Sequence, residues 1–262
     1  MNHKNKILES FIIQSFWGLG DLLFITPTLR KIKEAFPEIN ILVNTIWPQI
    51  LEGNPFVDII GRKREGIFLE YPAPAKCIKP KKHHIISDWE ILKKKTGLDI
   101  PKPDLKPEIY NFKVPEVKKG IGVQVRYKKN QWHNKKIWPF FDILIEKGKQ
   151  KGFDIEPIPF FKNVRQFIQA IANYRLVICS EGGISHTAKA VGTRAIVIYG
   201  GFAHPSWNGY HDQINLTNTL DCSYCYNPFP CRKKPERLCM RQISVDEVLK
   251  YLKDGLISNQ KN

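Results

Sequence analysis

Two short glycine turns contain the residue types with which this chain could do chemistry. The first is the segment FWGLGD at residues 16–21, between an apolar strand and a helix. Gly18 and Gly20 allow the backbone to turn sharply and approach a ligand closely. Asp21 falls at a helix N-terminus, where backbone amides favour negative charge. The pattern predicts an ionised carboxylate that can act as a general base, and the alternative is that Asp21 only caps the helix.

The second turn is the segment CSEGGISH at residues 179–186. Gly182 and Gly183 offer backbone amides at a helix start, which suits a phosphate or diphosphate. Glu181 is disfavoured beside phosphate, so we expect it to accept hydrogen bonds from a ribose or sugar hydroxyl. His186 lies in the first helical turn. Because His186 shares this turn with Glu181 and two glycines, we favour a role in ligand binding. The alternative is a buried histidine bonded only to other residues of the protein.

Basic residues lie between the two turns in the sequence. Arg126 directly follows an apolar strand at residues 120–125 and is expected to point toward the same ligand. Lys136 precedes Trp138-Pro139, and proline suits the first turn of a helix. A lysine placed there can neutralise phosphate charge. The alternative for any single lysine is a solvated surface position.

Four cysteines cluster near the C-terminus with the spacing C-x2-C-x5-C-x7-C, namely Cys222, Cys225, Cys231 and Cys239. A close pair followed by two more thiols suits a tetrahedral metal site, and thiolates select zinc or iron. Because four protein ligands leave no open position, the predicted metal is structural. Free thiols are the alternative. Cys179 ends an apolar strand and is expected to be buried.

The elements that must position these residues alternate between strand and helix. The apolar patterns predict strands at 11–13, 40–44, 57–60, 120–125, 154–157, 176–179 and 195–199. They predict helices at 22–36, 49–52, 88–96, 139–152, 165–173 and 184–191. A proline-rich stretch at 99–118 separates the two blocks. We therefore predict an α/β protein with domains at 1–115 and 116–262 and a cysteine finger at 221–241, and a ligand cleft at the carboxyl ends of the strands.

Composition limits the classes of protein that fit. The chain has 262 residues, a hydrophobic content of 42% and a formal net charge of +16. Such a charge attracts anionic partners, including nucleic acid, phosphorylated sugars and anionic membrane surfaces. The sequence has no apolar run of membrane-spanning length and no signal-peptide pattern. We expect a cytoplasmic protein, with possible peripheral contact with the inner face of the membrane.

Together the motifs resemble glycosyltransferase family 9, the heptosyltransferases. The matching segments are Gly18-Leu-Gly-Asp21 with Thr26-Pro27, Asn54-Pro55 with Val57-Asp58, Lys136-x-Trp138-Pro139 and Glu181-Gly-Gly-x-Ser-His186. The resemblance implies the GT-B architecture, with two Rossmann-like domains facing a cleft. It also implies transfer of a sugar, with inversion, from a nucleotide donor for which ADP-heptose is favoured.

The resemblance assigns a role to individual residues. Asp21 matches the family's base, Lys136 its phosphate-binding lysine and His186 its histidine. The donor-binding turn matches Glu181-Gly182-Gly183, although the family usually has aspartate where this chain has Glu181. The chain is also shorter than typical members between residues 61 and 115, and the acidic ribose contact expected near 156–166 has no counterpart.

The Glu-Gly-Gly turn and the cysteine cluster look closer to the autotransporter heptosyltransferases, which have an iron-binding finger. The resemblance therefore implies a structural iron or zinc ion and no catalytic metal. It leaves the acceptor open between a lipopolysaccharide or other glycan, a glycolipid and a protein hydroxyl.

Two other classes of function compete with this interpretation. A basic nucleic-acid-binding protein would explain the charge of +16 and the finger, whose cationic residues are Arg232, Lys233, Lys234, Arg237 and Arg241. It would leave the glycine turns without a task. A dinucleotide-dependent oxidoreductase would need a third glycine after Gly18 and Gly20, and this sequence lacks it.

Overall fold

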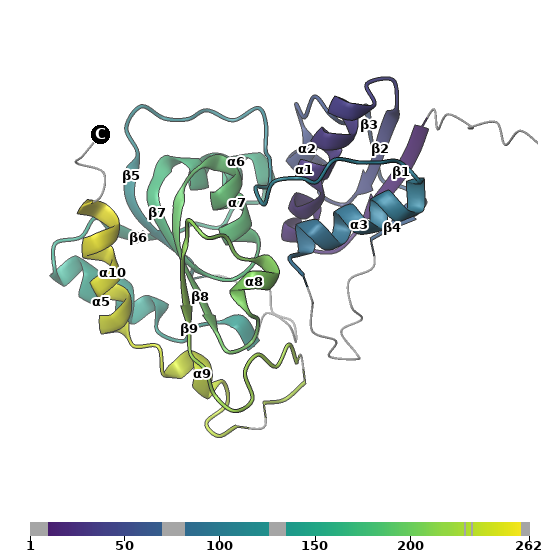
Figure 1. Cartoon of the computed structure of the whole chain (residues 1–262). Helices are drawn as coiled ribbons and strands as arrows, with labels where there is room; N and C mark the ends of the chain where they lie inside the picture. The colour runs from purple at the N-terminus through teal and green to yellow at the C-terminus, as the bar shows by residue number, and fades with distance from the viewer. Residues whose placement is uncertain (1–9, 70–81, 126–134, 228, 232, 258–262) are drawn as a thin grey trace, which may run out of the picture. The chain divides into compact units, whose positions relative to one another are not determined.

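The computed structural model describes residues 10–69, 82–125, 135–227, 229–231 and 233–257. Within these ranges the chain divides into two compact units, each built on a parallel sheet (Figure 1). The first unit comprises residues 10–69 and 84–111, and the second comprises residues 82–83 and 112–257. The division at Asn111 falls a few residues before the predicted boundary at 115.

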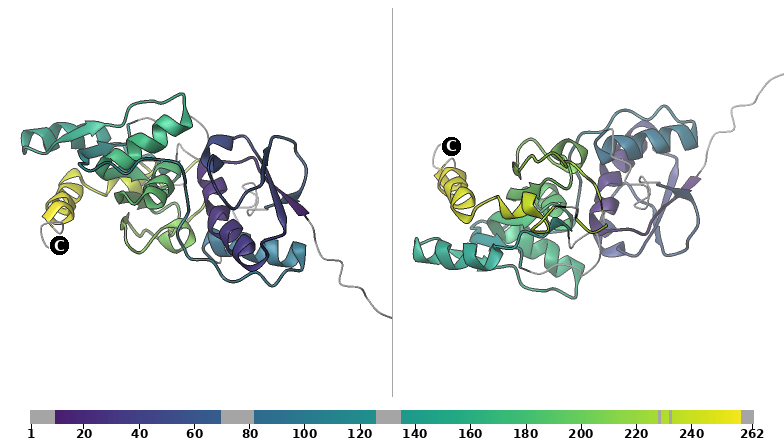
Figure 2. Two further views of the ribbon diagram at one scale, coloured as in Figure 1. Left: turned by 90° about the horizontal axis from the view of Figure 1, so that it is seen from above. Right: turned by 90° about the horizontal axis from the view of Figure 1, so that it is seen from below.

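The first unit has the sheet order β3-β2-β1-β4, and all its pairings are parallel. Its elements are β1 Ser10–Ser15, α1 Leu19–Ala35, β2 Asn40–Thr45, α2 Pro48–Leu51, β3 Ile59–Gly61, β4 Ile67–Phe68 and α3 His84–Thr96. Helices α1 and α3 lie side by side in both views of Figure 2, and the Phe24 and His84 rings stack at 5.2 Å. The strand order reverses at β1, directly before the first glycine turn.

The second unit has the sheet order β6-β5-β7-β8-β9, again with parallel pairings. Its elements are β5 Lys119–Val123, α5 Phe141–Gln150, β6 Ile155–Pro157, α6 Val164–Asn173, β7 Tyr174–Ser180, α7 Gly183–Val191, β8 Arg194–Gly200, α8 Pro205–Asn208, β9 Ile214–Thr217, α9 Leu238–Arg241 and α10 Val245–Ile257. The order reverses between β5 and β7. Open parallel sheets bind ligands at such switch points.

The cores of both units follow the predicted apolar patterns. Val123, Ile178 and Ile198 are fully buried in the second sheet, where α5 and α10 pack over them. Helices α8, α9 and α10 and the short strands β4 and β9 were not anticipated. Strand β4 has only two residues, too few for an alternating pattern to emerge.

The first helix begins three residues earlier than predicted, at Leu19 instead of Leu22. Gly18 is its N-cap in an extended conformation, so Gly20 lies inside the helix and Asp21 occupies its third position. Pro27 lies within the helix. The Thr26 hydroxyl donates to the Leu23 carbonyl at 2.8 Å, where the missing amide of residue 27 would otherwise have donated.

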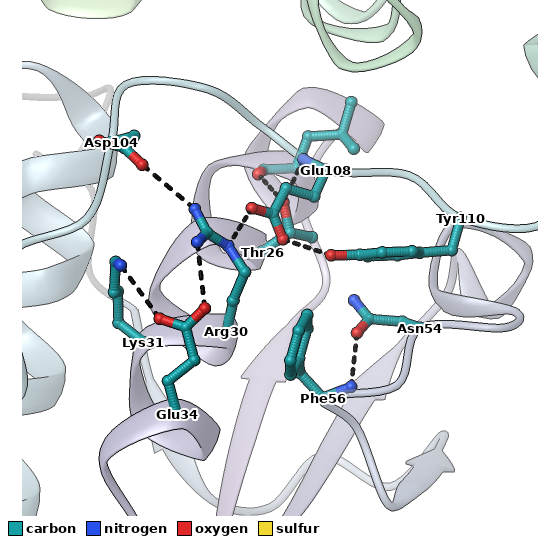
Figure 3. Close-up of polar contacts among 10 residues, drawn as sticks. Thr26, Arg30, Lys31, Glu34, Asn54, Phe56, Asp104, Glu108 and Tyr110 are labelled. Carbon is teal, nitrogen blue, oxygen red and sulfur yellow. Dashed lines mark hydrogen bonds and ion pairs between the residues drawn. The ribbon is translucent and has the colours of Figure 1, made fainter.

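An extended segment before Asn111 is fastened to α1 by Arg30, as Figure 3 shows. The Arg30 guanidinium donates to Glu108 at 2.5 Å and to Asp104 and Glu34 at 3.2 Å each. Tyr110 donates to the other oxygen of Glu108 at 2.7 Å. These contacts explain why the proline-rich stretch up to Asn111 belongs with the first unit.

No helix in the described ranges combines the length and apolar character needed to cross a bilayer.

Replacing Arg30 with Met should destabilise the first unit by about 2 kcal/mol, because the partly buried Glu108 carboxylate would lose its charged partner. Denaturant unfolding of the full chain measures this. Lys31→Met is the matched control, since Lys31 pairs only with the more exposed Glu34 and should leave stability unchanged. Equal effects of the two substitutions would contradict the assigned role of Arg30.

Candidate functional site

The first glycine turn holds Asp21 against the backbone of its own helix. The Gly18 amide donates to Asp21 Oδ2 at 2.6 Å, and the Asp21 side chain stays partly exposed. A Cβ on Gly18 would lie 3.0 Å from that oxygen, so a larger residue would crowd the carboxylate. The capping geometry is therefore present. It leaves a fixed, partly exposed carboxylate at a helix N-terminus, and the role of Asp21 as a base stays a prediction.

Aromatic residues beside Asp21 were missed by the sequence reasoning. Trp17 directly precedes the turn and is 49% exposed, and the Trp47 indole donates to the Trp17 carbonyl at 3.0 Å. Arg64, after β3, lies 5.5 Å from the Phe16 ring. The sequence did contain a signal for these aromatic residues: Trp17 stands directly before the glycine turn, and Trp47 follows the next strand.

The second glycine turn connects β7 to α7. Gly182 has φ +143°, a conformation that side chains rarely adopt. The Gly182 amide lies 3.2 Å from Ser185 Oγ, and that hydroxyl donates back to the Gly182 carbonyl at 2.8 Å. Gly182 and Gly183 remain partly exposed. The Gly182 amide, which was predicted to bind a phosphate, therefore donates to Ser185 in this structure.

The structure brings Lys136 and Glu181 together. Lys136 Nζ lies 2.5 Å from Glu181 Oε1, an ion pair without the alignment of a hydrogen bond. The other oxygen of Glu181 accepts from the Asn208 side chain at 2.9 Å. The Glu181 side chain is only 1% exposed, and that of Lys136 is 19% exposed. The site therefore presents the lysine to solvent and keeps the glutamate behind it.

Buried polar atoms surround this pair. Among the described residues, Ser180 Oγ, Tyr199 Oη and Asn208 Oδ1 are buried without a hydrogen-bond partner. Burial raises the pKa of the Tyr199 hydroxyl well above its usual value, and the nearby Glu181 charge raises it further. Such a concentration of unsatisfied buried groups is uncommon in a core that serves stability alone.

Lys136 does not stand directly before a helix. Pro139 was predicted in the first helical turn, but α5 begins at Phe141, and Pro139 lies in the turn that precedes it. The segment is fixed by Trp138, which is buried and donates from its indole to the Ile243 carbonyl at 2.9 Å. The packing of Trp138 thus fixes the short segment between Lys136 and α5.

His186 lies in the first turn of α7, as predicted, but its side chain is buried. Its Nδ1 lies 3.0 Å from the Tyr210 hydroxyl, and the rings meet edge to face. The Tyr210 ring also lies 5.7 Å from the ring of His83, whose Nε2 lies 3.1 Å from the Gly209 carbonyl oxygen. Burial lowers the pKa of His83 to about 4, so that histidine is neutral near pH 7. The ligand role of His186 stays a prediction.

Arg126 falls in the range 126–134, outside the described residues. Its predicted contact with the donor stays a prediction.

The four clustered cysteines follow β9 and dock on the end of β8. The Cys225 amide donates to the Gly201 carbonyl at 3.2 Å, and the Tyr226 amide donates to the Phe202 carbonyl at 2.9 Å. Burial raises the pKa of the Cys225 thiol, and backbone donation from Asn227 opposes that shift. The thiols of Cys222, Cys231 and Cys239 interact electrostatically with Cys225.

Across the described ranges, no group of three or more His, Cys, Asp or Glu side chains has the geometry of a metal site. The cysteines there are free thiols, and Cys179 is fully buried as predicted. The predicted metal finger is thus a set of four neighbouring thiols in this structure. Burial raises the pKa of the Cys239 thiol as well, and backbone donation from Gly201 and Met240 opposes that shift.

Two parallel-sheet units with glycine turns at helix starts define an α/β fold of the GT-B glycosyltransferase type, and solved structures agree. The iron-containing dodecameric glycosyltransferase TibC of enterotoxigenic E. coli matches with a TM-score of 0.74 at 15% identity, over 97% of this chain and 80% of TibC. TibC in complex with ADP-D-beta-D-heptose matches with a TM-score of 0.70 at 14% identity, over 95% and 76%. ADP-heptose LPS heptosyltransferase II of E. coli matches with a TM-score of 0.68 at 13% identity, over 96% and 99%.

Residues 162–238 match the family model of glycosyltransferase family 9 (heptosyltransferase). The range includes the second glycine turn and three of the four clustered cysteines. The family model confirms the resemblance over this range. A comparison with curated proteins finds no match. The family match favours the transferase over the nucleic-acid-binding protein and the oxidoreductase.

Replacing Gly201 with Ala should loosen the docked cysteine segment. A Cβ there would overlap Ser223 Oγ and approach Cys239 Cβ to 3.1 Å, and overpacking of this kind costs about 1–3 kcal/mol. Limited proteolysis within residues 221–241 and thermal unfolding measure the effect. Lys233→Ala, which removes an exposed ion pair with Asp221 in the same segment, should change neither. Wild-type protease resistance of the Gly201 variant would contradict this account.

Proposed function

We propose that this chain is an inverting heptosyltransferase that uses a nucleotide diphosphate heptose, with ADP-heptose favoured, as its donor. The observation that carries the proposal is the meeting of Lys136 with the second glycine turn at the switch point between β5 and β7. A diphosphate could approach a partly exposed ammonium and the start of a helix there. TibC, which has a similar fold, is described in complex with ADP-D-beta-D-heptose.

The reaction is a direct displacement at the anomeric carbon. Asp21 takes the proton of the acceptor hydroxyl while the acceptor oxygen forms its bond to that carbon. The bond between the carbon and the diphosphate oxygen breaks on the opposite face, which inverts the configuration. Lys136, Arg126 and the amides of Gly182 and Gly183 stabilise the negative charge of the leaving diphosphate. His186 contributes to the donor pocket through the first turn of α7.

The acceptor is a hydroxyl of a glycan, a glycolipid such as lipopolysaccharide, or a protein. The net charge of +16 supports work at an anionic surface. We therefore propose a cytoplasmic protein that can make peripheral contact with the inner face of the membrane. A structural metal held by the four cysteines accords with the description of TibC as iron-containing. It would hold the finger together, and the displacement itself needs no metal.

The donor is tested by thermal-shift measurements on the purified chain with ADP, GDP, UDP and CDP. The expected result is a concentration-dependent rise in melting temperature that is largest with ADP, because a ligand that binds only the folded state stabilises it. Transfer from ADP-heptose is then followed by mass spectrometry on a heptose-free lipopolysaccharide core and on a serine-containing protein. Absence of stabilisation by all four nucleotides would contradict the proposal.

Replacing Asp21 with Asn should slow transfer by about two to four orders of magnitude, the scale of general-base removal. ADP affinity should stay close to that of the wild type, because Asp21 is assigned no donor contact. Rate assays with saturating ADP-heptose and calorimetry with ADP separate the two effects. Turnover above a tenth of the wild-type value would exclude Asp21 as the base.

The purified chain should contain about one zinc or iron ion, because thiolate ligation selects soft or borderline metals. Elemental analysis after anaerobic purification with both metals supplied measures the content. Cys225→Ser should lower metal content and melting temperature, whereas Cys77→Ser, outside the cluster, should keep the metal. A metal-free protein with full stability and activity would show that the cluster is not a ligand set.

A further inference from the structure

The carboxylate of Glu181 is engaged on both of its oxygens by side chains distant in sequence. Lys136, which follows β5, lies 2.5 Å from Oε1, and Asn208, the last residue of α8, donates to Oε2 at 2.9 Å. Glu181 itself directly follows β7. Three connections of the second sheet therefore meet at one buried carboxylate.

Burial decides what this carboxylate can do. A buried charge is tolerated only when it is paired and hydrogen-bonded, and Lys136 and Asn208 supply those two requirements. A side chain that is 1% exposed presents almost no surface to a ligand. Glu181 is therefore poorly placed for the ribose or sugar hydroxyl that the sequence suggested, whereas Lys136 keeps part of its surface open to solvent.

The turn that carries Asn208 is rigid. Pro205 begins α8, and the Gly209 amide closes the turn on the Pro205 carbonyl at 2.6 Å. A Cβ on Gly209 would lie 2.7 Å from both that carbonyl oxygen and Tyr199 Oη, so glycine is required. The Gly209 carbonyl also contacts His83 Nε2. Asn208 is thus held in place from several sides.

We propose that Asn208 and Glu181 are positioning residues that aim the Lys136 ammonium at the donor's diphosphate. Asn208 fixes the Glu181 carboxylate, and the carboxylate fixes Lys136, which also lies 5.3 Å from the Phe202 ring. Neither positioning residue needs to touch the donor. The proposal rests on the proposed function, because it assumes that Lys136 meets a diphosphate.

The test compares two probes by calorimetry on the full chain: inorganic pyrophosphate, which has no ribose, and ADP. Asn208→Leu should weaken both by a similar factor of about ten or more, the scale of a hydrogen bond to a charged group. Lys136→Met should weaken both at least as much. The control is Asn173→Leu, whose side chain accepts from Gln169 at the opposite end of β7 and which should leave both affinities unchanged.

Comparing the two probes distinguishes a positioning role of Glu181 from a direct contact with the ribose. If Glu181 instead accepted a ribose hydroxyl, Asn208→Leu and Glu181→Gln would weaken ADP and leave pyrophosphate unchanged, which would overturn the proposal. Unchanged pyrophosphate affinity in Asn208→Leu beside a loss in Lys136→Met would also overturn it. If the wild-type chain bound neither probe, the proposed function itself would fail.

A nearly isosteric variant keeps the test valid if the leucine variant does not fold. Asn208→Asp places a second carboxylate against Glu181, and the pair regains a donor only when it takes up a proton. Its pyrophosphate affinity relative to the wild type should therefore rise severalfold as pH falls from 8 to about 5.5. A pH-independent ratio would contradict the positioning role.

Three buried titratable groups of this unit stay uncharged across this pH range. Burial, with the Glu181 charge adding to it, raises the pKa of Tyr199 and of Cys179 well above neutral, so both stay uncharged in that range. His83, with its pKa lowered to about 4 by burial, stays neutral. Lys136 is the cation of the pair itself, and the wild-type reference includes it.

Discussion

The arrangement of the second unit depends on one buried carboxylate. Removing Glu181 from water is unfavourable unless a cation and a hydrogen-bond donor come with it. Lys136 and Asn208 meet that condition, and in doing so they join the ends of β5, β7 and β8. The segment around Lys136 is in turn anchored by Trp138 to Ile243 and by the contact between Lys135 and Glu236. The buried pair and these two contacts together connect the switch point of the sheet with the cysteine segment.

The fold was largely predictable because its signals are local. Gly192 ends α7 in the left-handed conformation, as its position after an apolar helix suggested, and the buried strands follow the apolar runs. The first helix was placed too late because the side chain of Asp21 caps it from its third position, so the glycines looked like a turn. The packing of the extended segment before Asn111 against α1 could not be predicted, because Arg30 and Glu108, which form the contact, are far apart in the sequence.

The sequence predicted which residues belong to the candidate site, but it did not predict which of them contact one another. Glu181 and His186 were identified from their places in a glycine turn after a strand, and Lys136 from its place before Trp138-Pro139. That Lys136 and Glu181 would bind each other, and that Asn208 would complete the pair, depends on packing between segments that no local pattern connects. The same limit applies to His186, whose partner Tyr210 lies on a separate turn. Local sequence shows which groups are present, whereas tertiary packing decides which of them face a ligand.

Each glycine turn places a carboxylate near the start of a helix that follows a strand: Asp21 is the third residue of α1, and Glu181 lies just before α7. Their surroundings differ. Asp21 is partly exposed, and its carboxylate accepts from the Gly18 amide. Glu181 is buried against the Lys136 ammonium, and its side chain presents almost no surface to a reactant. Two carboxylates in different surroundings take different roles, as in other enzymes that use paired acids. This contrast favours Asp21 as the base and leaves Glu181 to organise the cation that meets the leaving group.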